Sequence, residues 1–281
     1  MINVVAGIIF QNDQVFCARR KKGLHLAGLW EFPGGKVENT ETYPEALERE
    51  LNEELSINAQ VGPYVGQSTF DFGDKLIRLH AYLCDSDMVN LELNDHDEIC
   101  WLSLDELTSV EWAPADIPLL QQLKTFIYYQ NAAKDYAAET IAFSMNEKYQ
   151  PFLDKVKKGG EILDLGCGSG RDSIAFKELG FNVTAVDPCP QMAEIATENI
   201  NEKVSVASCF NINFENCFDG VWACASLLHC PKSEMASALE NIIKALKPGA
   251  CAYVSLKGGE GEEVDDKSRF FSYYKEAEVE A

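Results

Sequence analysis

The segment EALERELNEEL, residues 45–55, places five glutamates within eleven positions. At 100° per helical residue, Glu50, Glu53 and Glu54 fall on one arc of a helix, and the leucines fall on the adjoining arc. Like charges three and four positions apart each cost about 0.2–0.5 kcal/mol. Carboxylate oxygens are ligands of hard divalent cations, so either a metal site or an ordinary solvated face explains the pattern.

A short turn in front of this helix adds residues suited to ligand binding. The stretch LAGLWEFPGGKVENTE contains Pro33, Gly34 and Gly35, and such a turn lets the backbone approach a ligand and expose a carbonyl. From Gly35 through Glu41 to the Arg-Glu-Leu-x-Glu-Glu run at residues 49–54, the spacing resembles the Nudix box. The resemblance favours the metal site over the solvated face.

The resemblance to the Nudix family implies roles for individual residues. It implies Mg²⁺ or Mn²⁺ as cofactor, held by oxygen atoms of Gly34 (its carbonyl), Glu50, Glu53 and Glu54. Arg49 then orients a ligand carboxylate, and Arg20 lies where relatives contact a substrate phosphate. The box has a glycine where this chain has Ser56, so we expect a slightly altered helix end, costing about 1 kcal/mol, but no lost ligand.

The stretch NDHDEICWLSLDEL resembles the region that supplies an additional acidic group in MutT-like enzymes. Asp95 takes the place of that group, with Asp97 and Glu98 as nearby alternatives. Such an acid binds metal or takes a proton from the attacking water. An ordinary loop acid fits Asp95 equally well.

The segment WAPADIPLL resembles the base-recognition segment of nucleoside-triphosphate pyrophosphohydrolases. By that resemblance Asp116 hydrogen-bonds the base edge and Trp112 stacks on the base face. A helix-capping aspartate and a core tryptophan are the alternatives. The implied reaction converts a nucleoside triphosphate and water to the monophosphate and pyrophosphate, with 8-oxo-dGTP and cytidine triphosphates as candidate substrates.

A second group of candidate binding residues follows a predicted strand in the other half of the chain. ILDLGCGSG contains Asp164, Gly166, Gly168 and Gly170, and it is followed by Asp187 at the end of the next predicted strand, VTAVD. An acid about 20 residues beyond a glycine turn is placed to accept ribose hydroxyls. The glycine spacing nevertheless departs from the dinucleotide-binding fingerprint.

Over roughly residues 129–276 the chain resembles class I S-adenosylmethionine-dependent methyltransferases. The resemblance implies S-adenosylmethionine as cofactor, with backbone approach at Gly166 and Gly168 and ribose binding by Asp187. It also implies that Asp164 orders the loop or meets the amino-acid end of the cofactor. His229 and Trp222 lie at or just after the strand end that faces the methyl acceptor, although a loop histidine with a structural partner is the commoner situation.

Methyltransferases of this class carry two further strands after the fifth, and this chain stops soon after SRFFSYYKEAEVEA. We therefore expect the fifth strand, ACAYVSL, to be an edge with unpaired backbone groups, and a homodimer through that edge is a candidate assembly. The second half is then either a methyltransferase of unknown acceptor or a non-catalytic module that binds S-adenosylmethionine or promotes oligomerisation.

The elements that position these residues divide the chain into two predicted domains. Residues 1–128 contain the strands NVVAGIIF, QVFCARR, KLIRLHAYLC and EICWLSL, which predict a mixed sheet in a Nudix α/β/α sandwich, closed by a helix near residues 117–127. Residues 129–281 alternate strands and helices, which predicts the Rossmann-like parallel sheet of a class I methyltransferase lacking its last strands. We expect the acidic stretch from about residue 258 to be partly disordered.

The composition of the chain limits the kinds of binding partner that we expect. The net charge of −21 argues against binding to a nucleic-acid backbone, because such binding needs a basic surface. No apolar run approaches the ~18 residues of a membrane span, and MINVVAGIIFQND lacks the features of a secretory signal. The ten cysteines are scattered singly, which predicts reduced thiols in the cytoplasm and no zinc site.

Overall fold

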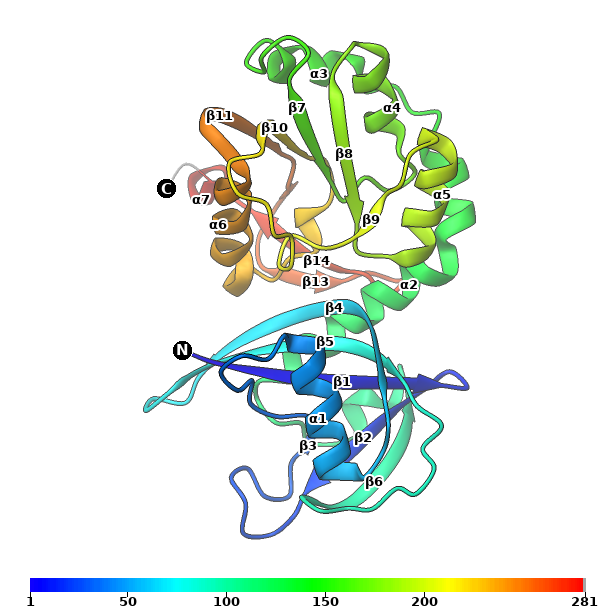
Figure 1. Ribbon diagram of the computed structural model, residues 1–281, viewed down its shortest axis with the longest axis vertical. Helices are drawn as coiled ribbons and strands as arrows, with labels where there is room; N and C mark the ends of the chain where they lie inside the picture. Colours follow the sequence, from blue (N-terminus) through cyan, green and yellow to red (C-terminus); the bar gives the residue numbers. More distant parts are fainter. Residues whose placement is uncertain (280–281) are drawn as a thin grey trace. The chain divides into compact units, whose positions relative to one another are not determined.

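The computed structural model describes residues 1–279, and Figure 1 shows their helices and strands. The chain divides into two compact units, residues 1–123 and residues 124–281. Within the described part, no helix is both long enough and apolar enough to cross a membrane.

The first unit is built on a mixed sheet, as the sequence predicts. Its strands are β1 (Ile2–Gln11), β2 (Gln14–Arg20), β3 (Trp30–Glu31), β4 (Gln60–Asp71), β5 (Leu76–Asp85) and β6 (His96–Ser103). The order is β3-β2-β1-β5-β4, and β6 pairs with β2. β1 and β5 are parallel, whereas the other neighbours are antiparallel. Two of these strands were not predicted from the sequence. β3 is too short to show a pattern, and the alternation of β4 is interrupted by irregular pairing near Tyr64.

Helix α1 (Tyr43–Leu55) carries the glutamates and begins with strong local signals. Thr42 caps its first turn in a reciprocal capping box with Glu45, and Pro44 lies in that turn. The helix buries its leucine stripe, and a Cβ on Gly7 of β1 would come within 3.0 Å of Leu51. The expectation of an altered helix end is wrong, because the residue after the helix itself adopts the left-handed conformation, with φ 56° and ψ 26°.

A 3-10 turn, η1 (Glu106–Ser109), leads toward the longest helix, α2 (Ile117–Thr140). The sequence predicts a helix near residues 117–127 and a second helical segment after residue 129. In the structure these segments form one continuous helix, with Pro118 in the first turn, where its missing N–H costs nothing.

The second unit contains a five-stranded parallel sheet. Its strands are β7 (Glu161–Leu165), β8 (Asn182–Asp187), β9 (Ser205–Val206), β10 (Phe218–Ala223) and β11 (Leu246–Val254), and their order is β11-β10-β7-β8-β9. Its helices are α3 (Asn146–Leu153), α4 (Arg171–Glu178), α5 (Pro190–Ile200), η2 (Leu227–His229), η3 (Lys232–Glu234) and α6 (Met235–Ala245). The predicted doubly wound arrangement is confirmed, and β11 lies at the edge of this sheet, as expected.

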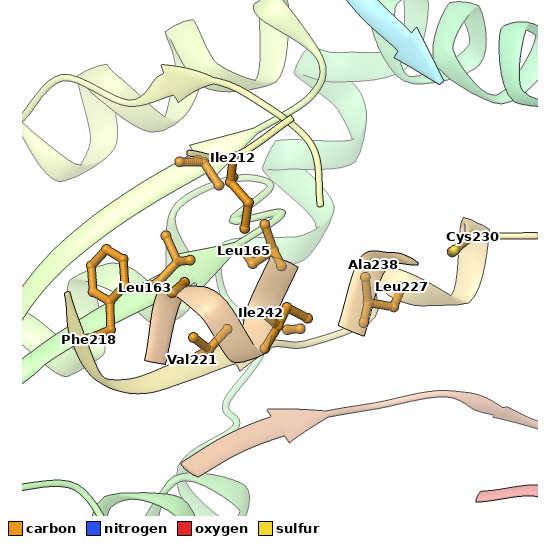
Figure 2. Packing of buried hydrophobic residues seen from close by; sticks show 12 residues of the cluster. Leu163, Leu165, Ile212, Phe218, Val221, Leu227, Cys230, Ala238 and Ile242 are labelled. Atoms are coloured by element: carbon orange, nitrogen blue, oxygen red, sulfur yellow. The ribbon is translucent and has the colours of Figure 1, made fainter. Parts of the chain in front are cut away.

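Side chains alternate along these strands, so the two faces of the sheet pack against different helices. Leu163 and Val221 pack with Ala238 and Ile242 of α6, as Figure 2 shows. Ile162 and Trp222 point to the other face, where they meet aromatic residues of α3 and α4: Tyr149, Phe152 and Phe176. Coverage of both faces is typical of a parallel sheet.

The acidic stretch after β11 corrects an expectation. Its residues form a separate sheet of β12 (Lys257–Gly258), β13 (Glu262–Val264) and β14 (Phe270–Tyr274) in the order β12-β14-β13, followed by the short helix α7 (Glu276–Val279). Phe270 and Phe271 are buried, and Ser272 is fully buried. The stretch is folded because these residues supply a small core that the acidic composition conceals.

Candidate functional sites

The Pro-Gly-Gly turn lies directly against β1. The N–H of Val5 donates to the Gly35 carbonyl at 2.8 Å, and the N–H of Gly7 donates to the Pro33 carbonyl at 2.8 Å. A Cβ on Gly34 would lie 2.1 Å from the Val5 carbonyl oxygen, and a Cβ on Gly35 would lie 2.3 Å from the Glu50 carboxylate. Only glycine fits at either position without displacing the backbone or the glutamate.

Arg49 lies among the carboxylates that the sequence assigns to it. Its Nε and Nη2 donate to Glu41 at 2.6 and 2.9 Å. Its Nη1 donates to Glu50 at 3.0 Å and to Glu53 at 3.3 Å, and its Nη2 donates to the Lys36 carbonyl at 3.1 Å. The guanidinium therefore touches two of the three predicted ligands, the geometry expected of a residue that orients them.

Glu54 is the most deeply buried of the three candidate ligands. Its side chain accepts a hydrogen bond from the Gly34 N–H at 3.1 Å. Burial, together with the charges of Glu31 and Glu50, raises the pKa of Glu54 to about 8. Burial also raises the pKa of Glu50, whereas the Glu53 side chain is 60% exposed.

Glu31 is a buried acid of this site that sequence reasoning missed. Its carboxylate accepts two hydrogen bonds from Arg20 Nη1, at 2.7 and 2.8 Å, and one from His96 Nε2 at 2.9 Å. Arg20 also donates through Nε to the His25 carbonyl at 2.7 Å. If Arg20 contacts a phosphate, as predicted, it does so while paired with Glu31. Nothing in the sequence indicated Glu31, because its strand has two residues and is too short to show periodicity.

Asp95 lies closer to the acidic helix than its alternatives. The N–H of the preceding Asn94 donates to the Glu54 carbonyl at 3.0 Å, and Asp95 is among the charges that raise the pKa of Glu54. Asp97 and Glu98 instead form ion pairs with Arg19 at 2.8 and 2.6 Å.

The structure buries both residues of the predicted base-recognition segment. Trp112 is 5% exposed, donates through Nε1 to the Leu107 carbonyl at 2.5 Å and packs on Phe32 at 4.8 Å between ring centroids. It is the core tryptophan of the alternative interpretation, and its face is not open for stacking. Asp116 accepts the Phe32 N–H at 2.9 Å, and burial, with the charge of Glu31, raises its pKa well above the usual range.

A partly exposed aromatic group near Arg20 was also missed. Phe72 packs against Phe70 at 4.7 Å and against His25 at 5.3 Å between ring centroids. The Lys75 ammonium lies 5.7 Å from the centre of the Phe72 ring. Phe72, Lys75 and His25 lie in loops and Phe70 lies near the end of β4, so no periodic signal identifies this group in the sequence.

The donor set of α1 has the chemistry of a hard divalent site. Among residues 1–279 no three His, Cys, Asp or Glu side chains, as they lie, enclose an ion. Glu54 is nevertheless a buried carboxylate and Glu50 a partly buried one, and burial and neighbouring negative charge raise the pKa of each, a situation that a bound cation relieves. The exposed Glu53 side chain has the freedom to join them. The ten cysteines are all free thiols.

The glycine loop of the second unit approaches Asp187. The Gly168 N–H donates to Asp187 Oδ2 at 2.9 Å, and the Cys189 N–H donates to Oδ1 at 2.9 Å. Gly168 has φ +56° and open space around its Cβ position, whereas a Cβ on Gly166 would lie 2.4 Å from the Ser226 side chain. Burial raises the pKa of Asp187 to about 6.

The remaining loop residues support this arrangement. Gly170 has φ +82° and precedes α4, and a Cβ there would lie 2.8 Å from Ile200. Asp164 accepts a hydrogen bond from the Ser173 hydroxyl at 2.6 Å, which ties the end of β7 to α4. Burial and the charge of Asp172 raise the pKa of Asp164 to about 7.

Trp222 and His229 both have partners within the fold. Trp222 is fully buried and donates to Asp172 at 2.8 Å. His229 Nε2 bonds the Tyr129 hydroxyl at 2.8 Å, and its Nδ1 donates to the Phe270 carbonyl at 2.6 Å. Burial lowers the pKa of His229 to about 4, and its two hydrogen bonds agree with the structural alternative for this histidine.

Comparison with known proteins gives two family matches. Residues 1–123 match the family model described as NUDIX domain, and residues 162–249 match the one described as methyltransferase domain.

Individual relatives agree with these matches. The CTP pyrophosphohydrolase of Escherichia coli is 43% identical over 121 residues, which cover 43% of this chain and 90% of that protein. The 8-oxo-dGTP diphosphatase of E. coli is 32% identical over 124 residues, 44% of this chain and 96% of that protein. A solved structure, the E. coli ORF135 protein, has 43% identity and a TM-score of 0.41, covering 44% of this chain and 88% of its own.

For the second unit, the 2-methyl-6-phytyl-1,4-hydroquinone methyltransferase of Synechocystis is 32% identical over 129 residues. The match covers 44% of this chain but only 40% of that protein.

The mixed sheet, the glycine turn and the acidic helix define the first unit as a Nudix domain. The chain belongs to the Nudix family, and its second unit carries a methyltransferase domain. Both resemblances read from the sequence are confirmed.

Proposed function

We propose that the Nudix domain hydrolyses a nucleoside triphosphate to the monophosphate and pyrophosphate with Mg²⁺ or Mn²⁺, and that CTP and 8-oxo-dGTP are the leading substrates. The observation that carries the proposal is the group of Glu50, Glu53 and Glu54 around the Gly34-Gly35 turn, with one buried carboxylate whose pKa is raised to about 8. The relatives named CTP pyrophosphohydrolase and 8-oxo-dGTP diphosphatase support the choice of substrates.

Each group of residues in the site has its own role in hydrolysis. The three glutamates and the Gly34 carbonyl would hold the cation, which when bound would polarise the phosphates and activate water. Arg49 keeps Glu50 and Glu53 in place. Asp95, partly exposed beside the end of α1, takes a proton from the attacking water.

At the base end, Phe72 replaces Trp112 as the stacking residue, because Phe72 is partly exposed and Trp112 is buried. Asp116 hydrogen-bonds the base edge, as the resemblance implies. Since its pKa is raised well above the usual range, its carboxyl can carry a proton and both donate and accept hydrogen bonds.

Steady-state kinetics with CTP, 8-oxo-dGTP and unmodified dGTP, with and without Mg²⁺, test this proposal. We expect Mg²⁺-dependent release of pyrophosphate and a preference for one of the first two substrates. Equal, metal-independent rates on all three would contradict it.

We propose that the second unit binds S-adenosylmethionine at the glycine loop. Its support is the open space at Gly168 beside the buried Asp187. Calorimetric titration with S-adenosylmethionine and S-adenosylhomocysteine tests it. Saturable binding that is lost in Asp187→Ala supports a cofactor site, whereas a folded chain that binds neither favours a non-catalytic module. Sedimentation tests the proposed homodimer through the edge of β11.

A further inference from the structure

Two cross-strand neighbours in the first unit are brought together by an irregularity of the sheet. Along β2 and β6 the pairing runs in register to Arg19 opposite Glu98, and it then shifts so that Arg20 lies opposite His96. Regular pairing would place Asp97 opposite Arg20. Bulges of this kind re-aim side chains, and they are common beside active sites.

The shift delivers two donors to one carboxylate. Arg20 Nη1 and His96 Nε2 both donate to Oε1 of Glu31, at 2.7 and 2.9 Å. Arg20 reaches Oε2 as well, at 2.8 Å. The Glu31 side chain is 11% exposed and that of His96 is 0% exposed, so little water is available to replace a lost donor.

The other ring nitrogen of His96 is buried and, within residues 1–279, unpaired. Its Nδ1 is buried and has no hydrogen-bond partner among the residues that the structure describes. Leaving a buried polar atom unpaired is unfavourable, and such exceptions in folded proteins call for a reason. A leucine would fill the same space without an unpaired atom. What leucine would not supply is the Nε2–H that Glu31 accepts.

Glu31 begins the segment that connects the two ends of the proposed nucleotide site. The next residue, Phe32, donates its N–H to Asp116 at 2.9 Å at the base end, and Gly34 donates its N–H to Glu54 at 3.1 Å at the phosphate end. The charge of Glu31 acts on both carboxyl groups. A change in the position of the Glu31 carboxylate would therefore alter the electrostatic environment of both Glu54 and Asp116.

We infer that His96 is a positioning residue of the nucleotide site, which together with Arg20 holds the Glu31 carboxylate between the glutamates of α1 and Asp116. The inference rests on the proposed pyrophosphohydrolase function. His96 acts through Glu31 and need not touch the nucleotide.

The test compares two buried histidines of the same unit. His96→Leu removes the donor to Glu31, and His96→Gln keeps an amide donor near the position of Nε2. His80→Leu is the matched control: His80 is 5% exposed, and its ring nitrogens bond Tyr64 and Asn3 rather than Glu31. For each variant, kcat/KM for CTP and for 8-oxo-dGTP is measured alongside the thermal unfolding midpoint.

We expect His96→Leu to lower kcat/KM at least tenfold and to change the ratio between the two nucleotides at least threefold. His96→Gln should recover to within threefold of wild type. His80→Leu should lower the unfolding midpoint while leaving the nucleotide ratio unchanged. A His96→Leu enzyme within threefold of wild type on both nucleotides would overturn the inference, as would a glutamine variant no better than leucine.

Wild-type protein that hydrolyses neither nucleotide would instead overturn the proposed function. In that case, titration of each nucleotide into the wild type and His96→Leu with Ca²⁺ decides the inference. A dissociation constant tenfold larger in the variant than in the wild type supports the inference. Equal dissociation constants, or no binding by the wild type, reject the inference.

Discussion

Replacing Gly35 by alanine places a methyl group where the Glu50 carboxylate now lies. The added Cβ would be 2.3 Å from the carboxylate carbon and from Oε2, well inside the 3.4 Å at which ordinary contact begins. Since the obstructing atoms are the end of a side chain, we expect Glu50 to move by about 1 Å while the backbone stays in place. A misplacement of about 1 Å costs on the order of 10²-fold in rate, or about 2.7 kcal/mol of transition-state stabilisation.

The assay is pyrophosphate release under saturating Mg²⁺, together with the thermal unfolding midpoint. Gly34→Ala is the informative contrast, because its Cβ would lie 2.1 Å from a backbone carbonyl, which cannot move aside. We therefore expect Gly34→Ala to lower the unfolding midpoint, and Gly35→Ala to lower kcat with the midpoint nearly unchanged. A fully active Gly35→Ala enzyme would refute the placement of Glu50 in the catalytic machinery.

Further predictions concern the same two domains. Glu53→Gln should abolish metal-dependent hydrolysis without changing the unfolding midpoint, because the side chain is 60% exposed; near-normal turnover would remove Glu53 from the ligand set. Asp116→Asn keeps an acceptor for the Phe32 N–H and should change the nucleotide preference more than the rate on the best substrate, whereas a uniform loss on all nucleotides would argue against base reading. Without divalent cation, the pKa of Glu54 is about 8 in the folded state and about 4.5 in the unfolded state. The contribution of Glu54 to the free energy of unfolding should therefore fall as pH rises from about 4.5 to 8, by at most about 1.4 kcal/mol per pH unit. Chemical denaturation of wild type and Glu54→Gln at pH 5 and pH 8 checks this, and equal pH dependence in the two proteins would contradict it.

The sequence by itself determined the two families and the local elements that carry their motifs. The Nudix box and the glycine loop are contiguous, and their residues act within one turn, one helix or one strand end. The leucine stripe of α1 is likewise a local pattern, which is why the acidic helix was predicted at residues 45–55 and observed at Tyr43–Leu55.

The tertiary structure alone decided which residues from distant segments meet. Glu31, Arg20 and His96 lie on three different strands, and they converge because a shift in the β2–β6 register turns His96 toward Arg20. The sequence favoured Trp112 as a stacking residue, and only its burial against Phe32 shows that it is a core residue. The acidic stretch after β11 folds because its two phenylalanines are buried and Phe271 packs on His229, outside the stretch, a contact that composition does not reveal. Such outcomes depend on long-range pairing and burial, which no local spacing of residues encodes.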